Sequence, residues 1–347
     1  MLLTARRFAR DAHHARAPLS EWIADHTPLA GEKERTMSLH VVVGAGPVGS
    51  AIARRLAAQG DDVVVVTRSG SGPDVAGVRR VAADASDAAR LTSLAVGAAS
   101  IHNAANPPYH RWAADWPPLH RSLLAAAERA GAVLVTVSNL YGYGPVDGPM
   151  TEDLPLAANG TKGRVRAAMW EQALAAHDDG RLRATEVRGS DYVCPGPGSH
   201  VGDRVMPRLL AGRPVTVLPR ADVAHSWTSV DDVARLAVVA ATDERAWGRA
   251  WHVPSNAPRT QRELVADLCR VAGLEPVPVR EHSRMLLRAL GAVNPMLREL
   301  GEVAYQFERP FVLDSSAAER TFGLAPTPWD EVLEAQVAAY RGTPART

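Results

Sequence analysis

The sequence predicts an α/β fold in which helices cover both faces of a parallel sheet. Residues 39–70 contain an apolar run, a glycine-rich turn, an amphipathic segment and a second apolar run, which is the pattern of a strand–helix–strand unit. Further apolar runs alternate with helical patterns up to about residue 190. Such alternation is typical of parallel sheets covered on both sides. We therefore expect a doubly wound sheet of Rossmann type with a smaller, interleaved C-terminal domain.

The elements follow one another in the order that this architecture requires. Expected strands cover 39–43, a run ending at 67, 78–82, 98–103, 132–138 and 182–187, and expected helices cover 47–59, 86–96, about 119–130 and 162–177. Residues 107–118 are rich in proline and aromatic side chains, which predicts a loop. From about Asp191 prolines and glycines cluster and the pattern loosens. We expect a Rossmann domain over 37–190 and a mainly substrate-binding domain over 191–347, with segments near 222–255 returning to the first.

Composition excludes several classes of protein. The formal net charge of the 347 residues is +1, so no broad basic surface favours nucleic acid or an acidic membrane. Two cysteines give neither a disulfide framework nor a metal cluster, and no histidine has metal-ligand partners at useful spacing. No apolar run reaches the ~18 residues of a membrane span, so a cytoplasmic location is the default expectation. Residues 1–36 show no clear periodicity, and we expect a disordered leader or a start assigned upstream of Met37.

The glycine-rich turn carries the strongest functional signal. Gly44, Gly46 and Gly49 form GxGxxG between a strand pattern and a helix pattern, the context of a dinucleotide-binding fingerprint. Gly44 allows the tight turn, Gly46 lets the backbone approach a pyrophosphate, and Gly49 lets the helix pack on the strand. The helix that starts at Pro47 and Val48 offers its positive end to the phosphates. An ordinary strand–turn–helix joint is the alternative, and the flanking pattern favours the dinucleotide site.

The end of the second strand indicates which dinucleotide binds. NAD-binding versions usually place an acidic residue there, about 20 residues after the glycines, for the ribose 2′-hydroxyl. This chain has Thr67, Arg68 and Ser69 instead. A guanidinium between two hydroxyls suits a 2′-phosphate, so we predict NADP rather than NAD. The alternative is that Arg68 is merely solvated.

Further motifs lie at regular places after the strands. They are Asp84 after the third strand, HNAA (102–105) at the end of the fourth, SNLYG (138–142) after the fifth, and RGSDYVCPG (188–196), WTSVDDVA (227–234) and FGLAPTPW (322–329) later in the chain. Together they resemble the extended short-chain dehydrogenase/reductase family of the epimerase/dehydratase type, over most of residues 38–340. The resemblance implies that Asp84 contacts adenine, and that Asn103, Ala104 and Ala105 lie against the cofactor. It also implies that Tyr192 and Pro195 form walls of the nicotinamide pocket.

The sequence departs from this family at the catalytic pair. Members usually carry Tyr-x-x-x-Lys at the start of the helix after the fifth strand, where the ammonium binds ribose and lowers the pKa of the phenol. Lys162 occupies the lysine position, but Ala158 occupies the tyrosine position. Only two of the 39 basic residues are lysine, which favours a functional Lys162 over a solvated one. Tyr141 is the provisional substitute phenol.

Two residues near Lys162 have competing interpretations. Ser138 is expected either to bind a substrate carbonyl or hydroxyl, or to satisfy backbone groups at the strand end. Tyr143 is an alternative phenol to Tyr141, and packing or loop anchoring is the structural alternative for both.

These observations predict an NADP(H)-binding oxidoreductase or epimerase/dehydratase acting on a small hydroxyl or carbonyl substrate. Ser138, Tyr141 and Lys162 are its expected catalytic residues, without a metal. A non-catalytic NADP-binding redox sensor or regulator is the alternative, because a sensor would tolerate the loss of the relay tyrosine. A homodimer is the expected assembly, as dimers are common in the family that the chain resembles.

Overall fold

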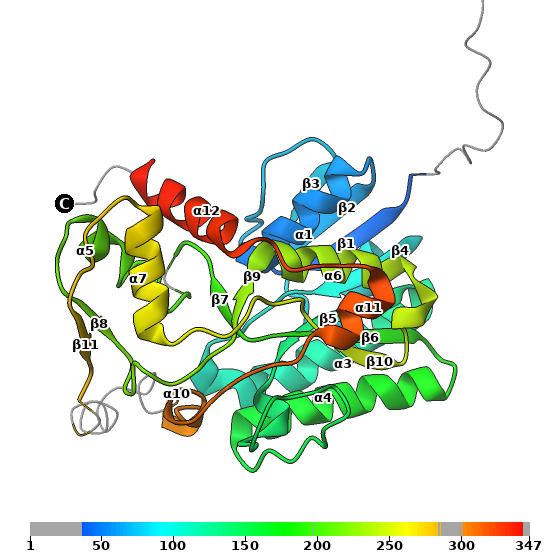
Figure 1. Ribbon diagram of the computed structural model, residues 1–347. Helices are drawn as coiled ribbons and strands as arrows, with labels where there is room; N and C mark the ends of the chain where they lie inside the picture. Colours follow the sequence, from blue (N-terminus) through cyan, green and yellow to red (C-terminus); the bar gives the residue numbers. More distant parts are fainter. Residues whose placement is uncertain (1–36, 197, 284, 286–298, 300, 343–347) are drawn as a thin grey trace, which may run out of the picture. The chain divides into compact units, whose positions relative to one another are not determined.

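The computed structural model describes residues 37–196, 198–283, 285, 299 and 301–342. These residues form one compact unit, whose central element is a seven-stranded sheet in the order β10-β6-β5-β4-β1-β2-β3 (Figure 1). All of its neighbouring strands are parallel. The strands are β1 (Leu39–Val43), β2 (Asp62–Thr67), β3 (Val78–Ala82), β4 (Ala98–Asn103), β5 (Val133–Asn139), β6 (Arg183–Gly189) and β10 (Arg249–His252). The predicted doubly wound parallel sheet is confirmed.

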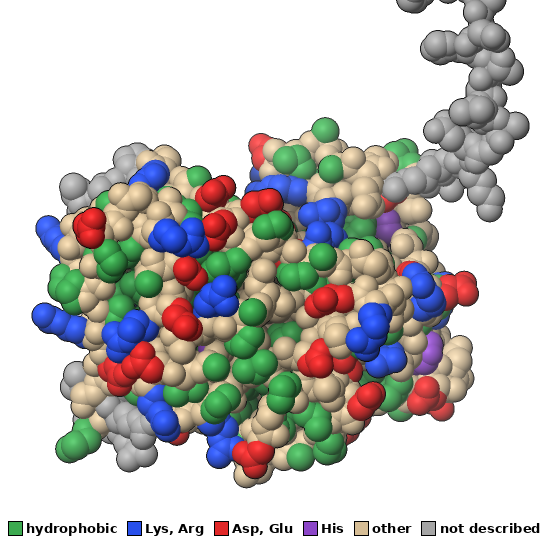
Figure 2. All heavy atoms as spheres, viewed as in Figure 1, with side chains coloured by type: hydrophobic (Ala, Val, Ile, Leu, Met, Phe, Trp, Pro, Cys, Tyr) green, Lys and Arg blue, Asp and Glu red, His purple; other side chains and the backbone are tan. Residues whose placement is uncertain are grey.

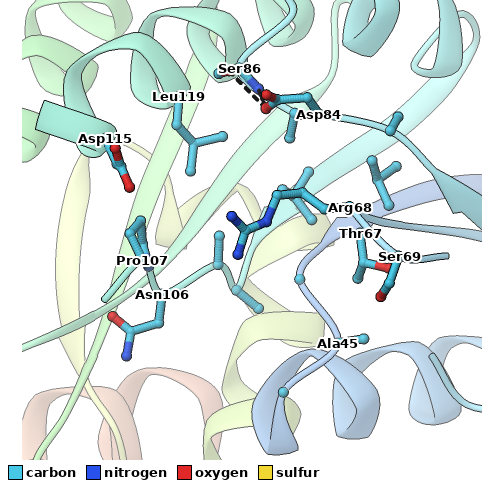
Figure 3. A pocket seen from close by; sticks show the side chains of 18 of the residues that line it. Ala45, Thr67, Arg68, Ser69, Asp84, Ser86, Asn106, Pro107, Asp115 and Leu119 are labelled. Atoms are coloured by element: carbon cyan, nitrogen blue, oxygen red, sulfur yellow. Dashed lines mark hydrogen bonds between the residues drawn. The ribbon is translucent and has the colours of Figure 1, made fainter. Parts of the chain in front are cut away.

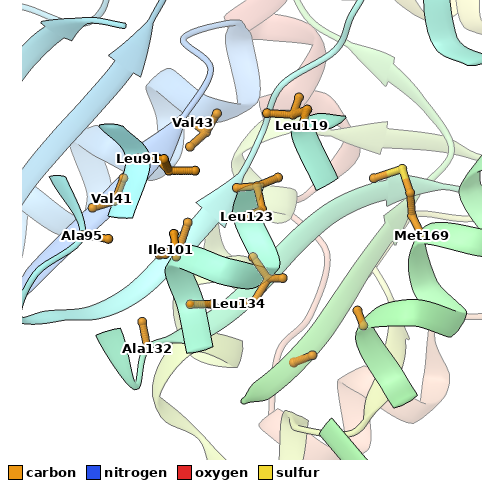
Figure 4. Packing of buried hydrophobic residues seen from close by; sticks show 14 of the residues in the cluster. Val41, Val43, Leu91, Ala95, Ile101, Leu119, Leu123, Ala132, Leu134 and Met169 are labelled. Atoms are coloured by element: carbon orange, nitrogen blue, oxygen red, sulfur yellow. The ribbon is translucent and has the colours of Figure 1, made fainter. Parts of the chain in front are cut away.

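Helices cover both faces of this sheet. One face carries α2 (Ala88–Leu94), α3 (Trp112–Ala130) and α4 (Thr161–Asp178), and the other carries α1 (Pro47–Ala58) and α6 (Val230–Thr242). Successive residues of a strand alternate between the two cores. Val41 and Val43 pack beneath α2 and α3 (Figure 4), whereas Val42 packs beneath α1 and α6. The apolar runs of the sequence are therefore strands buried on both faces.

The helix α3 begins earlier than the sequence predicts. Residues 109–111 form a short 3-10 helix (η1, Tyr109–Arg111), and α3 starts at Trp112, inside the segment expected to be a loop. Pro117 and Pro118 lie within it and each removes a backbone hydrogen bond. Trp112 and Trp116 are fully buried on the same face, and burial of two indoles outweighs the cost of the prolines.

The C-terminal half contributes a smaller set of elements and a core of its own. They are β7 (Asp191–Val193), α5 (Met206–Leu210), β8 (Val215–Val217), β9 (Trp227–Ser229), η3 (Glu244–Ala246), α7 (Gln261–Val271), β11 (Val279–Glu281), α10 (Tyr305–Glu308), α11 (Ser316–Phe322) and α12 (Trp329–Arg341). The strands pair as β7–β9 and β8–β11. A separate apolar cluster joins α5, α7 and α12. In this half, α6 and β10 belong to the Rossmann sheet and its helical layers.

The surface shows no concentration of one charge on the face in view. Acidic and basic side chains are interspersed over it (Figure 2), in keeping with the net charge of +1. Within the described residues, no helix is long and apolar enough to cross a membrane.

Candidate cofactor and substrate sites

The glycine turn between β1 and α1 has the geometry that a dinucleotide needs. Gly44 has a φ of +101°, and a Cβ there would stand 2.6 Å from the Ala104 carbonyl oxygen, so a side chain is excluded both by conformation and by space. A Cβ at Gly49 would collide with the Gly44 carbonyl. Around Gly46, by contrast, nothing lies within 4 Å of a Cβ position. The turn is therefore tight on its protein side and open at Gly46, where α1 begins without a side-chain cap.

A pocket of about 780 Å³ opens beside this turn, at the carboxyl ends of β1, β2 and β4 (Figure 3). In doubly wound sheets this edge is where ligands bind. Its lining comprises Val43, Gly44, Ala45, Gly46, Val66, Thr67, Arg68, Ser69, Ser71, Ala83, Asp84, Ala85, Ser86, Ala104, Ala105, Asn106, Pro107, Pro108, Arg111, Asp115, Pro118 and Leu119. The volume and the mixture of backbone, hydroxyl and charged groups fit the adenosine half of a dinucleotide.

The charges in this pocket leave one cation without a carboxylate partner. Arg111 makes two hydrogen bonds to Asp115, at 2.8 and 2.7 Å. Asp84 accepts from the backbone and hydroxyl of Ser86, at 2.9 and 2.8 Å, and these bonds lower its pKa. Arg68 projects into the pocket (Figure 3) and makes no ion pair within 4 Å with any residue that the structure describes. Its guanidinium is available to a bound anion.

The residues expected to hold the cofactor divide into two groups. Gly44, Gly46, Arg68, Ser69, Asp84, Ala104 and Ala105 line the pocket. Pro47, Val48, Gly49, Asn103, Lys162, Tyr192 and Pro195 do not belong to its lining. Asn103 is fully buried beside it, and its Nδ2 has no hydrogen-bond partner among the described residues. The lining also includes residues that the sequence did not indicate, namely Ser71, Ser86, Asn106, Arg111 and Asp115. The last three lie in or beside the segment that was expected to be a loop.

The structure gives Lys162 partners that the sequence did not predict. Its side chain is 1% exposed, and Nζ donates to Glu299 at 2.6 Å and to Glu302 at 2.9 Å. The backbone N–H of Lys162 also donates to Glu302. Both acids come from a segment about 140 residues later, where no sequence spacing could have indicated them. Two carboxylates offset the charge of the one ammonium.

Position 158 does not share a helix with Lys162. The helix α4 begins at Thr161, with Gly160 as its N-cap, so Ala158 lies in the preceding loop, where its backbone N–H donates to Gly142. Positions 158 and 162 are therefore not one turn apart on a common helix. The reason is local, since the glycine at 160 ends the helix before it reaches 158.

Tyr141 lies in η2 (Tyr141–Tyr143), directly after β5, and is buried. Its hydroxyl is 3.0 Å from the hydroxyl of Tyr109 in η1, and the Nζ of Lys162 lies 5.8 Å from the Tyr109 ring centre. Burial raises the pKa of both phenols. At neutral pH each therefore holds its proton and can donate it. Ser138 is buried at the end of β5, and no hydrogen bond of its hydroxyl to another described residue is present.

Tyr143 belongs to a buried network that leaves it no free donor. Arg188 donates to the Tyr143 hydroxyl at 2.7 Å and is itself paired with Glu186. His252 is 2.8 Å from the same hydroxyl, and its Nδ1 faces the Asp314 carbonyl at 2.9 Å. Since the carbonyl can only accept, Nδ1 carries the proton and Nε2 accepts from Tyr143. The Tyr143 hydroxyl is thus engaged in structural hydrogen bonds, and Arg188, at the end of β6, is buried in the same network.

Asp191 joins two histidines of the C-terminal half. Its carboxylate bonds His225 at 2.7 Å and His200 at 3.1 Å, and these contacts hold its pKa below the usual range despite burial. His225 also faces the Gln306 carbonyl at 3.1 Å and stacks on Phe307. Both ring nitrogens of His225 thus lie within hydrogen-bond distance of an oxygen atom.

A second, smaller pocket of about 290 Å³ lies in the C-terminal half. It is lined by His200, Arg204, Arg208, Thr216, Val217, Leu218, Gln261 and His282. His200 therefore joins this pocket to Asp191. With two arginines and two histidines and no acidic residue in the lining, the pocket suits an anionic group.

Comparisons with known proteins agree with this geometry. A family model described as the NAD dependent epimerase/dehydratase family matches residues 40–253. No curated protein sequence matches the chain. The dTDP-glucose 4,6-dehydratase of Bacillus anthracis, solved in complex with NAD, superposes with a TM-score of 0.69 at 18% identity, over 88% of this chain and 96% of that one.

Two epimerase structures are similar to the chain in the same way. The UDP-glucose 4-epimerase of Thermotoga maritima gives a TM-score of 0.71 at 18% identity, over 88% of this chain and 99% of that one. An epimerase of Methanothermobacter thermautotrophicus gives 0.73 at 16% identity, over 88% and 92%. At these identities the structures establish a shared fold.

Proposed function

Because the chain belongs to the NAD dependent epimerase/dehydratase family, and is an enzyme of the extended short-chain dehydrogenase/reductase type, we propose that it uses NADP(H) to act on a small hydroxyl or carbonyl substrate. The observation that carries this proposal is the 780 Å³ pocket, where the open glycine turn meets an arginine without a carboxylate partner. When bound there, the cofactor would exchange a hydride with the substrate. The residues of the chain would bind and orient the cofactor and would donate or accept the proton of the reaction.

Different residues along the pocket are proposed to bind different parts of the cofactor. Gly46 and the start of α1 would hold the pyrophosphate, Asp84 the adenosine, and Arg68 with Ser69 the 2′-phosphate. The Ser69 hydroxyl donates to the Ser71 hydroxyl at 3.0 Å beside Arg68, so the Ser71 O–H is a further donor at the same corner. Asp84 and Asp115 also line this pocket. Arg111 binds both oxygens of Asp115, and Ser86 donates twice to Oδ1 of Asp84, which reduces their repulsion of a phosphate.

For the proton we propose Tyr141, acting together with Tyr109. The two hydroxyls are hydrogen-bonded, and burial keeps both phenols protonated at neutral pH, so that either can give a proton to a developing alkoxide. Ser138 would hold the substrate oxygen. Lys162 is proposed to orient the ribose, which requires its ammonium to exchange one of its two carboxylate partners for a hydroxyl.

We propose that the substrate carries an anionic group, as sugar nucleotides do. The pocket at Arg204 and Arg208 supports this substrate class. Two of the similar structures, a dTDP-glucose 4,6-dehydratase and a UDP-glucose 4-epimerase, are named for sugar-nucleotide substrates. A distal anionic group in that pocket would anchor the substrate, while its reacting carbon lies near Ser138.

Two measurements test the proposal. Calorimetric titration of the purified protein with NADPH and NADH is expected to give tighter binding of NADPH. A panel of aldehydes, ketones and sugar nucleotides is then expected to give NADPH oxidation or NADP reduction with at least one substrate. Binding without any turnover across the panel would instead support the redox-sensing alternative.

Lys162→Met is expected to lower turnover by about 100-fold or more, a typical loss for a residue that supports proton transfer, and to leave the Kd of NADPH little changed. Arg164→Met, an exposed cation of the same helix, is the matched control. Full turnover in Lys162→Met would remove Lys162 from the site.

A further inference from the structure

Arg166 is a buried cation without an anionic partner among the described residues. It lies on α4, one turn after Lys162, and is 6% exposed. Nε and Nη1 have no hydrogen-bond partner, and no described carboxylate lies within 4 Å of the guanidinium. Glu186, an acid of the adjacent strand β6, is already paired with Arg188. An uncompensated buried charge costs several kcal/mol, so a binding partner outside the protein chain would stabilise this arrangement.

The surroundings of Arg166 supply aromatic walls and further donors. Its Cζ lies 4.7 Å from the Trp112 ring centre and 4.4 Å from that of Trp116. The indole Nε1 of Trp116 is also buried without a hydrogen-bond partner among the described residues. His120, one helical turn further along α3, is buried as well, and its ring faces the backbone of Met169. Trp and Arg nitrogens can only donate. The cluster therefore combines one positive charge with several unused N–H groups.

We propose that Arg166 and Trp116, together with Trp112 beside the guanidinium, form a binding site for a carboxylate. A single guanidinium neutralises a monoanion but not a doubly charged phosphate, and two flat indole rings favour a planar group. The N–H groups of Arg166 and Trp116 supply the hydrogen bonds that carboxylate oxygens accept. The site lies outside both pockets described above, whose linings include none of these three residues.

The position of the site indicates what would carry the carboxylate. Trp112, which covers Arg166, also contacts Tyr109 and Tyr141, with ring centres 4.9 and 6.2 Å apart. A substrate held at the Tyr109–Tyr141 pair would thus have its reacting end next to Arg166. This assignment to substrate rests on the function proposed above. A free small carboxylate is the other source of the same chemistry.

The first test needs no substrate. Calorimetric titration of the whole protein with sodium formate and sodium acetate, against sodium chloride at equal ionic strength, is expected to show saturable binding of the carboxylates. Arg166→Met should weaken that binding at least ~10-fold, the loss expected for charged hydrogen bonds. Arg121→Met, which removes an exposed arginine of α3, should leave it unchanged. Absence of carboxylate binding to the wild type, or unchanged binding in Arg166→Met, would overturn the proposal.

Misfolding is separated from loss of the site by stability. Since Arg166→Met replaces an unpaired buried charge with an apolar chain, the variant should unfold at the same or a higher urea concentration than the wild type without carboxylate. Arg166→Lys, which keeps the charge but fewer donors, should bind formate with intermediate affinity. A lysine variant that binds as weakly as the methionine variant would contradict a role for the charge.

A second test distinguishes the two sources. UDP-glucuronate and UDP-glucose differ by a carboxylate, and Arg166→Met should raise KM at least ~10-fold for the acid alone if the substrate supplies the group. Loss of formate binding with both KM values unchanged would assign the site to a free carboxylate. If neither compound reacts, the proposed function fails for this substrate class, while the formate titration still decides the site.

Discussion

At the scale of single residues, neighbouring tyrosines differ in what they can do. Tyr141 and Tyr143 lie two positions apart in one short 3-10 helix. The Tyr143 hydroxyl is held by Arg188 and His252, whereas the Tyr141 hydroxyl meets the Tyr109 hydroxyl and the side chain of Gln306. The sequence could identify both as candidates but could not separate them, because the partners that separate them lie 45 and 109 positions away.

Tyr143→Phe is expected to lower the free energy of unfolding by about 1–3 kcal/mol, since a buried guanidinium N–H and an imidazole nitrogen lose their partner. Urea denaturation measures the change. Tyr141→Phe, which removes a contact between two neutral hydroxyls, should cost less stability but lower turnover. An equal loss of stability in both variants, with full turnover in Tyr141→Phe, would contradict the assignment.

Arg68→Ala is expected to weaken NADPH binding by about 10–100-fold, the worth of charged hydrogen bonds to a phosphate, and to change the Kd of NADH far less. Calorimetry with both cofactors measures the difference. Arg54→Ala, which removes an exposed arginine of α1 outside the pocket, is the control. If NADH already binds the wild type more tightly and Arg68→Ala changes neither affinity, Arg68 does not select NADP.

At the scale of elements, the strands were predictable and one helix was not. Continuous valine runs such as residues 63–66 specify a strand buried on both faces, and β3 and β4 begin and end where the sequence predicts. The start of α3 was missed because Pro117 and Pro118 indicate a break locally. Only the packing of Trp112 and Trp116, which depends on α4 and the sheet, overrides them. The residues of the cofactor pocket in this segment were missed for the same reason.

The helix α7 offers a test of local stabilisation. Thr260 accepts from the Glu263 backbone at 3.1 Å, and Glu263 accepts from the Thr260 backbone at 2.8 Å, which forms a complete capping box. Thr260→Ala is expected to lower the free energy of unfolding by about 1 kcal/mol. Thr242→Ala, near the exposed end of α6, is the control in the same urea titration. Equal effects of the two variants would show that the cap contributes nothing.

At the scale of the whole molecule, buried histidines determine the response to acid. Burial lowers the pKa of His102 to about 3 and that of His120 to about 4, from an ordinary value of 6.5, and also lowers that of His252. Above pH 6.5 these rings are neutral in both the folded and the unfolded chain. Below pH 6.5 these rings are protonated in the unfolded chain but stay neutral in the folded chain until the pH reaches their lowered pKa values. The free energy of unfolding therefore falls as the pH falls.

Each ring is expected to contribute up to about 1.4 kcal/mol per pH unit between pH 6.5 and its folded pKa. Urea titrations at steps between pH 7.5 and pH 4.5 measure this slope. His120→Gln, which cannot titrate, should reduce the slope, and the exposed His110→Gln serves as its control. A slope that is the same in wild type and His120→Gln would show that His120 is protonated in the folded state.

Local patterns predicted the parallel sheet and most of the helices that cover it, but neither the start of α3 nor the contacts at the centre of the fold. The glycine turn and Arg68 could be identified from local sequence, and both line the larger pocket. Lys162 pairs with acids about 140 residues later, and Asp191 pairs with His225. Arg166 lacks a partner because no described segment brings an acid to it. No spacing within a single motif encodes them.

The strand order also has a consequence for synthesis of the chain. The edge strand β10 pairs with β6, yet roughly 60 residues separate the two in sequence. At translation rates of about 5–20 residues per second, the outer edge of β6 stays unpaired for roughly 3–12 s after it emerges. An open edge of this kind can recruit strands from other nascent chains. Aggregation during overexpression should therefore be worst for chains that stop between β6 and β10.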